Sequence, residues 1–201
     1  MIKSFCASFT LAGFSLLATT AAAQPRATTQ PARPNSTSRK AAAPDVSGWN
    51  KVTWGMTVAQ AKKLFAAADL AEPESKLTSG RYPVRFVVNN IDIGGLPCTA
   101  SVETDRDTDS IAGVTIRPAK EFQERAELRA TVFDKLKQLL IQKYGGPKSD
   151  NQRPEGDDVE SQVLWSFPST TIELYRSEGG YDTGFVLLIY SAADKKALDA
   201  L

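Results

Sequence analysis

The sequence has 201 residues, of which 42% are hydrophobic and 23% charged, with 24 basic side chains, 23 acidic ones and no histidine. This length suits a single domain of ordinary size once segments that do not fold are set aside. The near-zero net charge argues against a nucleic-acid or membrane-surface partner. Without histidine the chain cannot build a Ser-His-Asp or Cys-His site, or a zinc site of the usual His and Cys kind. Carboxylate-only, Ser-Lys and Tyr-based chemistries are still possible.

The N-terminus has the pattern of an export signal. Lys3 precedes an apolar run over residues 5–18, which is too short to act as a stop-transfer helix, and three alanines at 21–23 offer small residues for cleavage. We therefore expect residues 1–23 to be a signal peptide cut after Ala23, and the protein to be periplasmic or secreted; a retained anchor is the alternative. Cys6 lacks the small-residue tetrapeptide that precedes a lipidated cysteine, so we do not expect a lipoprotein.

A linker separates this signal from the folded part. Residues 24–47 contain four prolines among Ala, Thr, Ser, Arg and Asn, with no aromatic residue. Such a segment cannot bury enough apolar surface to offset the entropy of ordering, so we expect it to be disordered. A single domain is expected over residues 48–201, and with one cysteine in the exported chain its core must form without an internal disulfide.

The first half of this domain begins with a short strand over 51–54. Thr57 and Gln60 then form a capping box, which predicts a helix that runs to about residue 68 and is followed by a loop. Three strands are expected after this loop, over 84–93, from 97 to 103, and around 112–116. In the second of them Cys98, Ala100 and Val102 alternate with polar residues and form the inward face, so we expect Cys98 to be a buried thiol.

The second half begins with the longest helical pattern, over residues 122–144. Its apolar residues form one stripe with a 3.6-residue period, and Gly145 to Pro147 end the helix. A charged loop follows, then three more strands, in which Val163, Trp165 and Phe167, and then Ile172 and Leu174, are expected to face inward. The last strand, 185–190, is apolar at every position, which indicates a central strand or one covered on both faces. A short terminal helix is expected over residues 192–201.

Each half therefore predicts a helix, a loop and three antiparallel strands. We expect an α+β fold in which a single antiparallel sheet of about six strands carries two main helices on one face, built as a pseudo-duplicated helix-plus-three-strand unit. The two halves share no detectable residue identity, so the duplication is inferred from the pattern of elements alone.

The segment Trp54-Gly55-Met56-Thr57, with Gln60 and Ala61 after it, resembles the helix start of small secreted bacterial envelope proteins. Two such groups are the SmpA/OmlA-type outer-membrane assembly lipoproteins and the β-lactamase inhibitor proteins of tandem αβ repeats. Lys-Tyr-Gly-Gly-Pro at 143–147 resembles the end of the second helix in related periplasmic proteins. The chain lacks the lipid-bearing cysteine of the first group and the disulfides of the second. The resemblance implies fold, envelope location and a non-enzymatic interaction role.

Two acidic clusters are candidate sites. Asp105, Asp107 and Asp109 have the alternate spacing of a calcium loop, but Ser110 stands where that loop needs Gly and Ile116 where it needs Glu. A solvated hairpin turn is the better interpretation, and a cation site is the alternative. A second cluster over residues 157–160 could hold paired carboxylates, although nothing in the sequence predicts a cleft around it.

Four side chains are candidate binding residues: Tyr175, Trp49, Arg81 and Arg176. Trp49 and Tyr175 have polar neighbours, which favours exposure, and aromatic and Arg side chains are the usual anchors of interfaces. We therefore expect an exported, non-enzymatic binding or interaction module, without a cofactor, whose partner is a protein or an envelope polymer. The alternatives are a histidine-free hydrolase that uses carboxylates on an envelope polymer, and an inhibitor of a secreted enzyme.

Overall fold

The computed structural model describes residues 45–74, 82–155, 158–179 and 184–193. The expected signal peptide, most of the expected linker, Arg81, Asp157 and nearly all of the expected C-terminal helix lie outside these residues. The described residues begin three positions before the expected domain boundary. Ser169 donates to Asp45 from its backbone N–H (3.0 Å) and its hydroxyl (2.5 Å), and Thr170 Oγ1 donates to the Val46 carbonyl.

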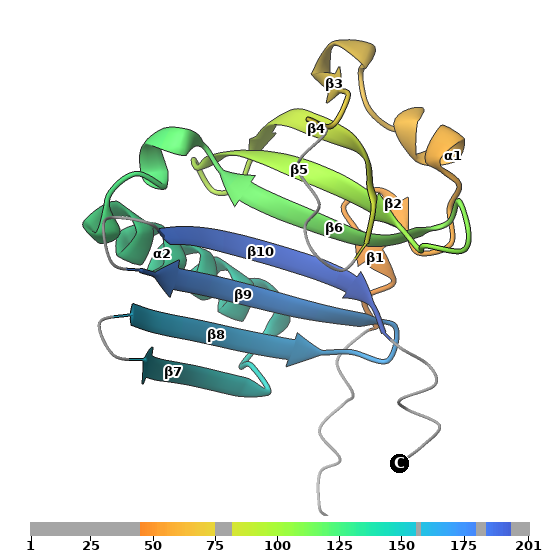
Figure 1. Ribbon diagram of the computed structural model, residues 1–201. Helices are drawn as coiled ribbons and strands as arrows, with labels where there is room; N and C mark the ends of the chain where they lie inside the picture. Colours follow the sequence, from red (N-terminus) through yellow and green to blue (C-terminus); the bar gives the residue numbers. More distant parts are fainter. Residues whose placement is uncertain (1–44, 75–81, 156–157, 180–183, 194–201) are drawn as a thin grey trace, which may run out of the picture. The chain divides into compact units, whose positions relative to one another are not determined.

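The main body is an eight-stranded antiparallel sheet in the order β3-β4-β5-β6-β10-β9-β8-β7 (Figure 1). Its strands are β3 (Leu70–Ala71), β4 (Val84–Asp92), β5 (Pro97–Thr104), β6 (Ile111–Pro118), β7 (Ser149–Glu155), β8 (Asp158–Ser166), β9 (Thr170–Glu178) and β10 (Gly184–Ala192). A separate hairpin pairs β1 (Gly48–Trp49) with β2 (Val52–Thr53). The sheet thus consists of two meanders, β3–β6 and β7–β10, which meet where β6 pairs with β10. The first strand of each meander, β3 or β7, forms an edge of the sheet.

The described helices are α1 (Val58–Lys62), α2 (Ala126–Tyr144) and the 3₁₀ turns η1 (Ala67–Asp69) and η2 (Lys120–Phe122). The expected capping box is present at α1, where Thr57 Oγ1 accepts from the Gln60 N–H and Gln60 Oε1 accepts from the Thr57 N–H. The longer helix ends before Gly145, whose φ of +82° and ψ of −169° lie outside the left-handed helical region but are readily adopted by glycine.

The predicted fold class is wrong. The sheet has eight strands instead of about six, and α2 is the one helix of at least seven residues in the described chain, instead of two main helices. The expected first helix ends after five residues, because Phe65 turns to stack on Trp49 with ring centroids 6.2 Å apart. Each half contributes four strands to the sheet, so the repeated helix-plus-three-strand unit is wrong as well. The added strands, β3 and β7, occupy the two edges.

One face of the sheet carries the core. Its inward residues alternate along every inner strand, and in register they form continuous rows: Phe86 and Val88 on β4; Cys98, Ala100 and Val102 on β5; Val114 and Ile116 on β6; Val186, Leu188 and Tyr190 on β10; Ile172 and Leu174 on β9; Val163 and Trp165 on β8. The inward positions expected for Cys98, Trp165, Ile172 and Leu174 are confirmed. Helix α2 covers β9 and β10 on this face (Figure 1).

The opposite face of β10 is only partly covered. The strand is central, as expected, since it lies between β6 and β9. Phe185 is 43% exposed, however, and Leu187 and Ile189 are half-buried, so coverage of both faces is not what makes this strand apolar. In the described part of the chain, no helix combines the length and the apolar character needed to cross a membrane.

Candidate functional site

A cleft of about 600 Å³, lined by apolar side chains with polar ones among them, opens between α2 and the turn that joins β4 to β5. Its lining comes from four parts of the chain: Trp49 and Asn50 from the β1–β2 hairpin; Ile91 and Asp92 at the end of β4 with Ile93 and Gly94 in the turn after it; Leu136, Leu139, Leu140, Gln142 and Lys143 from α2; and Leu188 and Tyr190 from β10. The cleft lies over β10, which both α2 and β1 of the hairpin contact.

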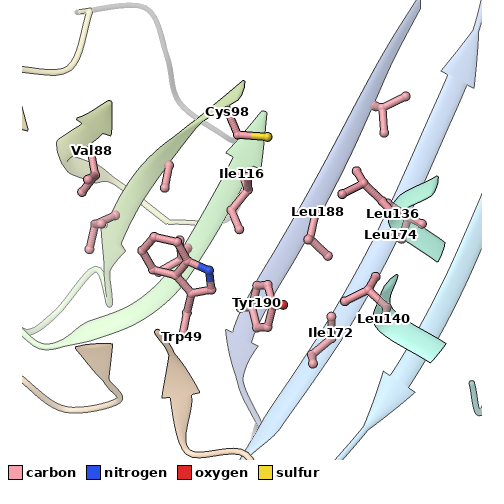
Figure 2. Packing of buried hydrophobic residues seen from close by; sticks show 14 of the residues in the cluster. Trp49, Val88, Cys98, Ile116, Leu136, Leu140, Ile172, Leu174, Leu188 and Tyr190 are labelled. Atoms are coloured by element: carbon pink, nitrogen blue, oxygen red, sulfur yellow. The ribbon is translucent and has the colours of Figure 1, made fainter. Parts of the chain in front are cut away.

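The floor and two walls of the cleft are continuous with the core. In Figure 2, Leu188 and Tyr190 on β10 lie between Trp49 on one side and Leu136 and Leu140 on the other. All five residues are less than a tenth exposed. These residues belong to the packed core, so the floor and walls of the cleft are in place without a ligand, which lowers the entropic cost of binding.

The β4–β5 turn approaches α2 closely at one end of the cleft. Gly94 has a φ of +61°, and a Cβ atom built on it would lie 2.7 Å from Leu139 Cδ1. The positive φ favours glycine at this position, and any larger residue would also require the Leu139 side chain to move. The turn is held by Asp92, whose Oδ1 accepts from the Gly95 N–H at 2.9 Å. The helix and the turn together fix the width of the cleft at this end.

The polar groups of the cleft lie at its rim. Asn50, Asp92, Gln142 and Lys143 are all exposed. Lys143 Nζ lies 5.0 Å from the ring centroid of Tyr144, and neither Lys143 nor Asp92 forms an ion pair with another described residue. At the floor, burial raises the pKa of Tyr190, and the neighbouring Tyr144 hydroxyl adds to the increase. The Tyr190 phenol therefore stays neutral at any physiological pH and offers a hydrogen-bonding group, not a charge.

The candidate binding residues from the sequence do not form one site. Trp49 is 7% exposed and packs in the core, so the expectation of exposure is wrong, although its position does bring it to the cleft. Arg176 shares the core face, with its guanidinium 5.3 Å from the Phe133 ring, so it is not on an outward face. Arg81 lies outside the described residues.

Tyr175 lies on the opposite face of the sheet, as expected. Its hydroxyl donates to Glu160 Oε1 at 2.6 Å, and its ring packs on Phe185 with centroids 5.7 Å apart. Burial raises the pKa of Tyr175 to about 12, and the hydrogen bond to Glu160 adds to the shift. This arrangement ties Glu160 to a neutral phenol, and it places Tyr175 away from the cleft.

The acidic run between β5 and β6 forms a hairpin turn, as expected. Asp105 Oδ1 accepts from the Asp107 N–H at 2.9 Å, and the Asp105 N–H donates to the Ser110 carbonyl at 3.0 Å. Asp109 is exposed in the same turn. Within the described ranges, no group of three or more His, Cys, Asp or Glu side chains is arranged to hold a metal ion. Of the second cluster, only the side chain of Glu160 can be placed.

The cleft was missed at the sequence level because its residues are up to 141 positions apart, from Trp49 to Tyr190. The one local signal was the alternation of Leu188 and Tyr190 in a central strand, and that signal indicates a core as readily as a site. Comparisons with protein families, with curated proteins and with solved structures found no match to this chain.

Proposed function

We propose that this protein is an exported, non-enzymatic binding module of the bacterial cell envelope, and that the cleft is its binding surface. The observation that carries the proposal is the lining of the cleft, where aliphatic and aromatic side chains form the floor and walls while Asp92 and Lys143 lie exposed at the rim. Binding sites for organic ligands and for apolar anchors of partner proteins have this composition. Burial of apolar ligand surface there contributes about 25 cal/mol per Å².

The N-terminal pattern supports the envelope location. Lys3, the apolar run 5–18 and the alanines at 21–23 are arranged as in cleavable signals. The resemblance of the segment that starts at Trp54 to secreted envelope proteins points the same way. The mass of the protein recovered from the periplasm is expected to correspond to a chain that begins at Gln24. A chain that keeps Met1, or that carries an acyl group, would contradict the location.

A matched pair of variants tests the binding surface. Gln142 and Gln138 are both exposed on α2, but only Gln142 lines the cleft. Gln142→Trp fills the mouth of the cleft, whereas Gln138→Trp adds the same side chain elsewhere on the same helix. In a pull-down from periplasmic extract, we expect the bound partner to be lost with Gln142→Trp and kept with Gln138→Trp.

Two outcomes would contradict this proposal. A partner that both variants capture equally binds elsewhere, and the face around Tyr175 would be the next surface to test. Turnover of an envelope polymer by the purified protein, lost on substitution of Asp157, Asp158 or Glu160 by the amide, would establish the hydrolase alternative instead. Of the described residues that line the cleft, Asp92 is the one carboxylate, and a glycosidase would need two.

A further inference from the structure

We propose that the ligand of the cleft is a single acyl chain with an anionic headgroup. This inference rests on the proposed function, because it names the ligand chemistry of the same cleft. The volume of about 600 Å³ lies within the range of roughly 300–1,000 Å³ that is usual for sites of small organic molecules. It exceeds what one apolar side chain of a partner protein would fill.

The walls of the cleft suit an aliphatic chain. Ile91 and Ile93 near the β4–β5 turn and Leu139 and Leu140 on α2 all line the cleft, as does Leu188 on β10. Each methylene group buried against such a surface strengthens binding about fourfold. Polar groups in the ligand would find few partners at the floor, where Tyr190 offers one neutral hydroxyl. The polar part of the ligand therefore belongs at the rim.

The charges near the rim favour an anion. Two lysines of α2, Lys135 and Lys143, lie on either side of Leu139 in sequence, and neither forms an ion pair with a described residue. Lys135 Nζ reaches the β4–β5 turn, where it lies 3.8 Å from a Cβ built on Gly95. The one rim carboxylate, Asp92, is already a hydrogen-bond acceptor for the Gly95 N–H. A carboxylate or phosphate headgroup at the rim would meet Lys143, or Lys135 at the other end, while its chain enters the cleft.

Isothermal titration of the purified protein with dodecyl probes tests this assignment, with every probe kept below its micelle concentration. Dodecanoate provides the anion, dodecyl maltoside the uncharged head and dodecyltrimethylammonium the cation. A lysophosphatidylglycerol with the same chain distinguishes a phospholipid source from a free fatty acid. We expect both anions to bind more tightly than the other two probes, and the tighter of the two to indicate the source.

Two substitutions, each with a control variant, separate the contribution of the acyl chain to binding from that of the headgroup. Gln142→Trp should abolish binding of every probe, and Gln138→Trp should abolish none. Lys143→Gln should weaken dodecanoate about two- to fivefold, as expected for an exposed ion pair, and leave dodecyl maltoside unchanged. Lys63→Gln is the control, since Lys63 is exposed and does not line the cleft.

The outcomes distinguish this inference from the proposed function. If no dodecyl probe binds, but Gln142→Trp still abolishes capture of a partner protein, the acyl ligand is wrong and the binding surface is right. If the cationic probe binds as tightly as dodecanoate, or Lys143→Gln has no effect, the anionic headgroup is wrong. If no probe binds and partner capture is insensitive to Gln142→Trp, both proposals fail.

Discussion

The side-chain amide of Gln123 forms the two backbone hydrogen bonds with Val186 that a neighbouring strand would otherwise form. Gln123 Oε1 accepts from the Val186 N–H at 2.8 Å, and Gln123 Nε2 donates to the Val186 carbonyl at 3.1 Å. In the register of β6 and β10, where Ile116 pairs with Leu188, the residue opposite Val186 is Pro118. Proline has no N–H to donate, so the Gln123 amide supplies the donor that β6 lacks at this position.

Replacement of Gln123 by Leu should lower the free energy of unfolding by about 1–3 kcal/mol, because it leaves backbone groups of Val186 without partners. Gln123→Glu keeps an acceptor but places a carboxylate oxygen against the Val186 carbonyl, so it should destabilise the protein as well. Urea unfolding measures both. Gln138→Leu, at an exposed site on α2, should change stability by no more than about 0.5 kcal/mol. Equal stability of Gln123→Leu and the parent protein would show that the pairing contributes nothing.

A buried ion pair joins α2 to the end of β9. Arg129 is 1% exposed, and its Nε and Nη2 donate to Glu178 Oε2 at 2.7 and 2.5 Å while its Nη1 donates to the Gln123 carbonyl at 2.6 Å. Glu178→Gln should destabilise the protein by about 3–5 kcal/mol, because it leaves the Arg129 charge buried without a counter-charge.

The double variant Arg129→Met, Glu178→Met should be more stable than the sum of the two single substitutions predicts. Denaturant unfolding of the four proteins in this cycle gives the coupling energy. Additive effects would show that the two side chains do not interact in solution.

Asp45 anchors the N-terminal end of the described chain through a pH-dependent contact. The hydrogen bond from the Ser169 hydroxyl is the main cause that lowers the pKa of Asp45 below its usual 3.8. Since the pKa is lower in the folded state than in the unfolded state, this contact stabilises the fold above about pH 3.8, and the stabilisation is lost as the pH falls through the folded-state value.

Asp45→Ala should therefore have a lower Tm than the parent protein at pH 7, and the difference should close as the pH falls below 3.8. Thermal unfolding followed by circular dichroism over pH 2–7 measures it. Asp134→Ala is the control, because it removes an exposed carboxylate that lacks these contacts. A Tm difference for Asp45→Ala that stays constant over this range would contradict the assignment.

Cys98 should react slowly with thiol reagents while the protein is folded. The side chain is 4% exposed, and burial, followed by the charge of Asp92, raises the pKa of its thiol to about 11. The reactive thiolate is therefore rare at pH 8 as well as shielded. We expect modification of the chain that begins at Gln24 to be slow in buffer and fast in urea. Equal rates in the two conditions would place Cys98 at the surface.

Local patterns predicted the inner strands well, because alternation along β5, β8 and β9 reflects burial of one face only. They failed at β7, whose residues Ser149–Glu155 include no large aliphatic side chain. An edge strand is held by its backbone pairing with one neighbour, and it needs no inward apolar residue to form. The sequence of such a strand therefore looks like a loop.

Local patterns also failed where tertiary contacts decide the outcome. The alanines near residue 67 favour a helix, but packing of Phe65 against Trp49 and Phe86 ends α1 before them. Trp49 appeared exposed because its sequence neighbours are polar, whereas the two-residue strand β1 is too short to show any periodicity. The cleft depends on these same long-range contacts, so its position could not be predicted.

Methyl NMR of the protein with labelled Ile and Leu tests most directly whether the cleft is the binding surface. Titration with dodecanoate should shift the signals of Ile91, Leu139 and Leu188, which line the cleft, and leave Leu164 and Leu187, on the opposite face of the sheet, unchanged. Shifts confined to Leu164 and Leu187, or no shift at any signal as the probe approaches its micelle concentration, would contradict the account.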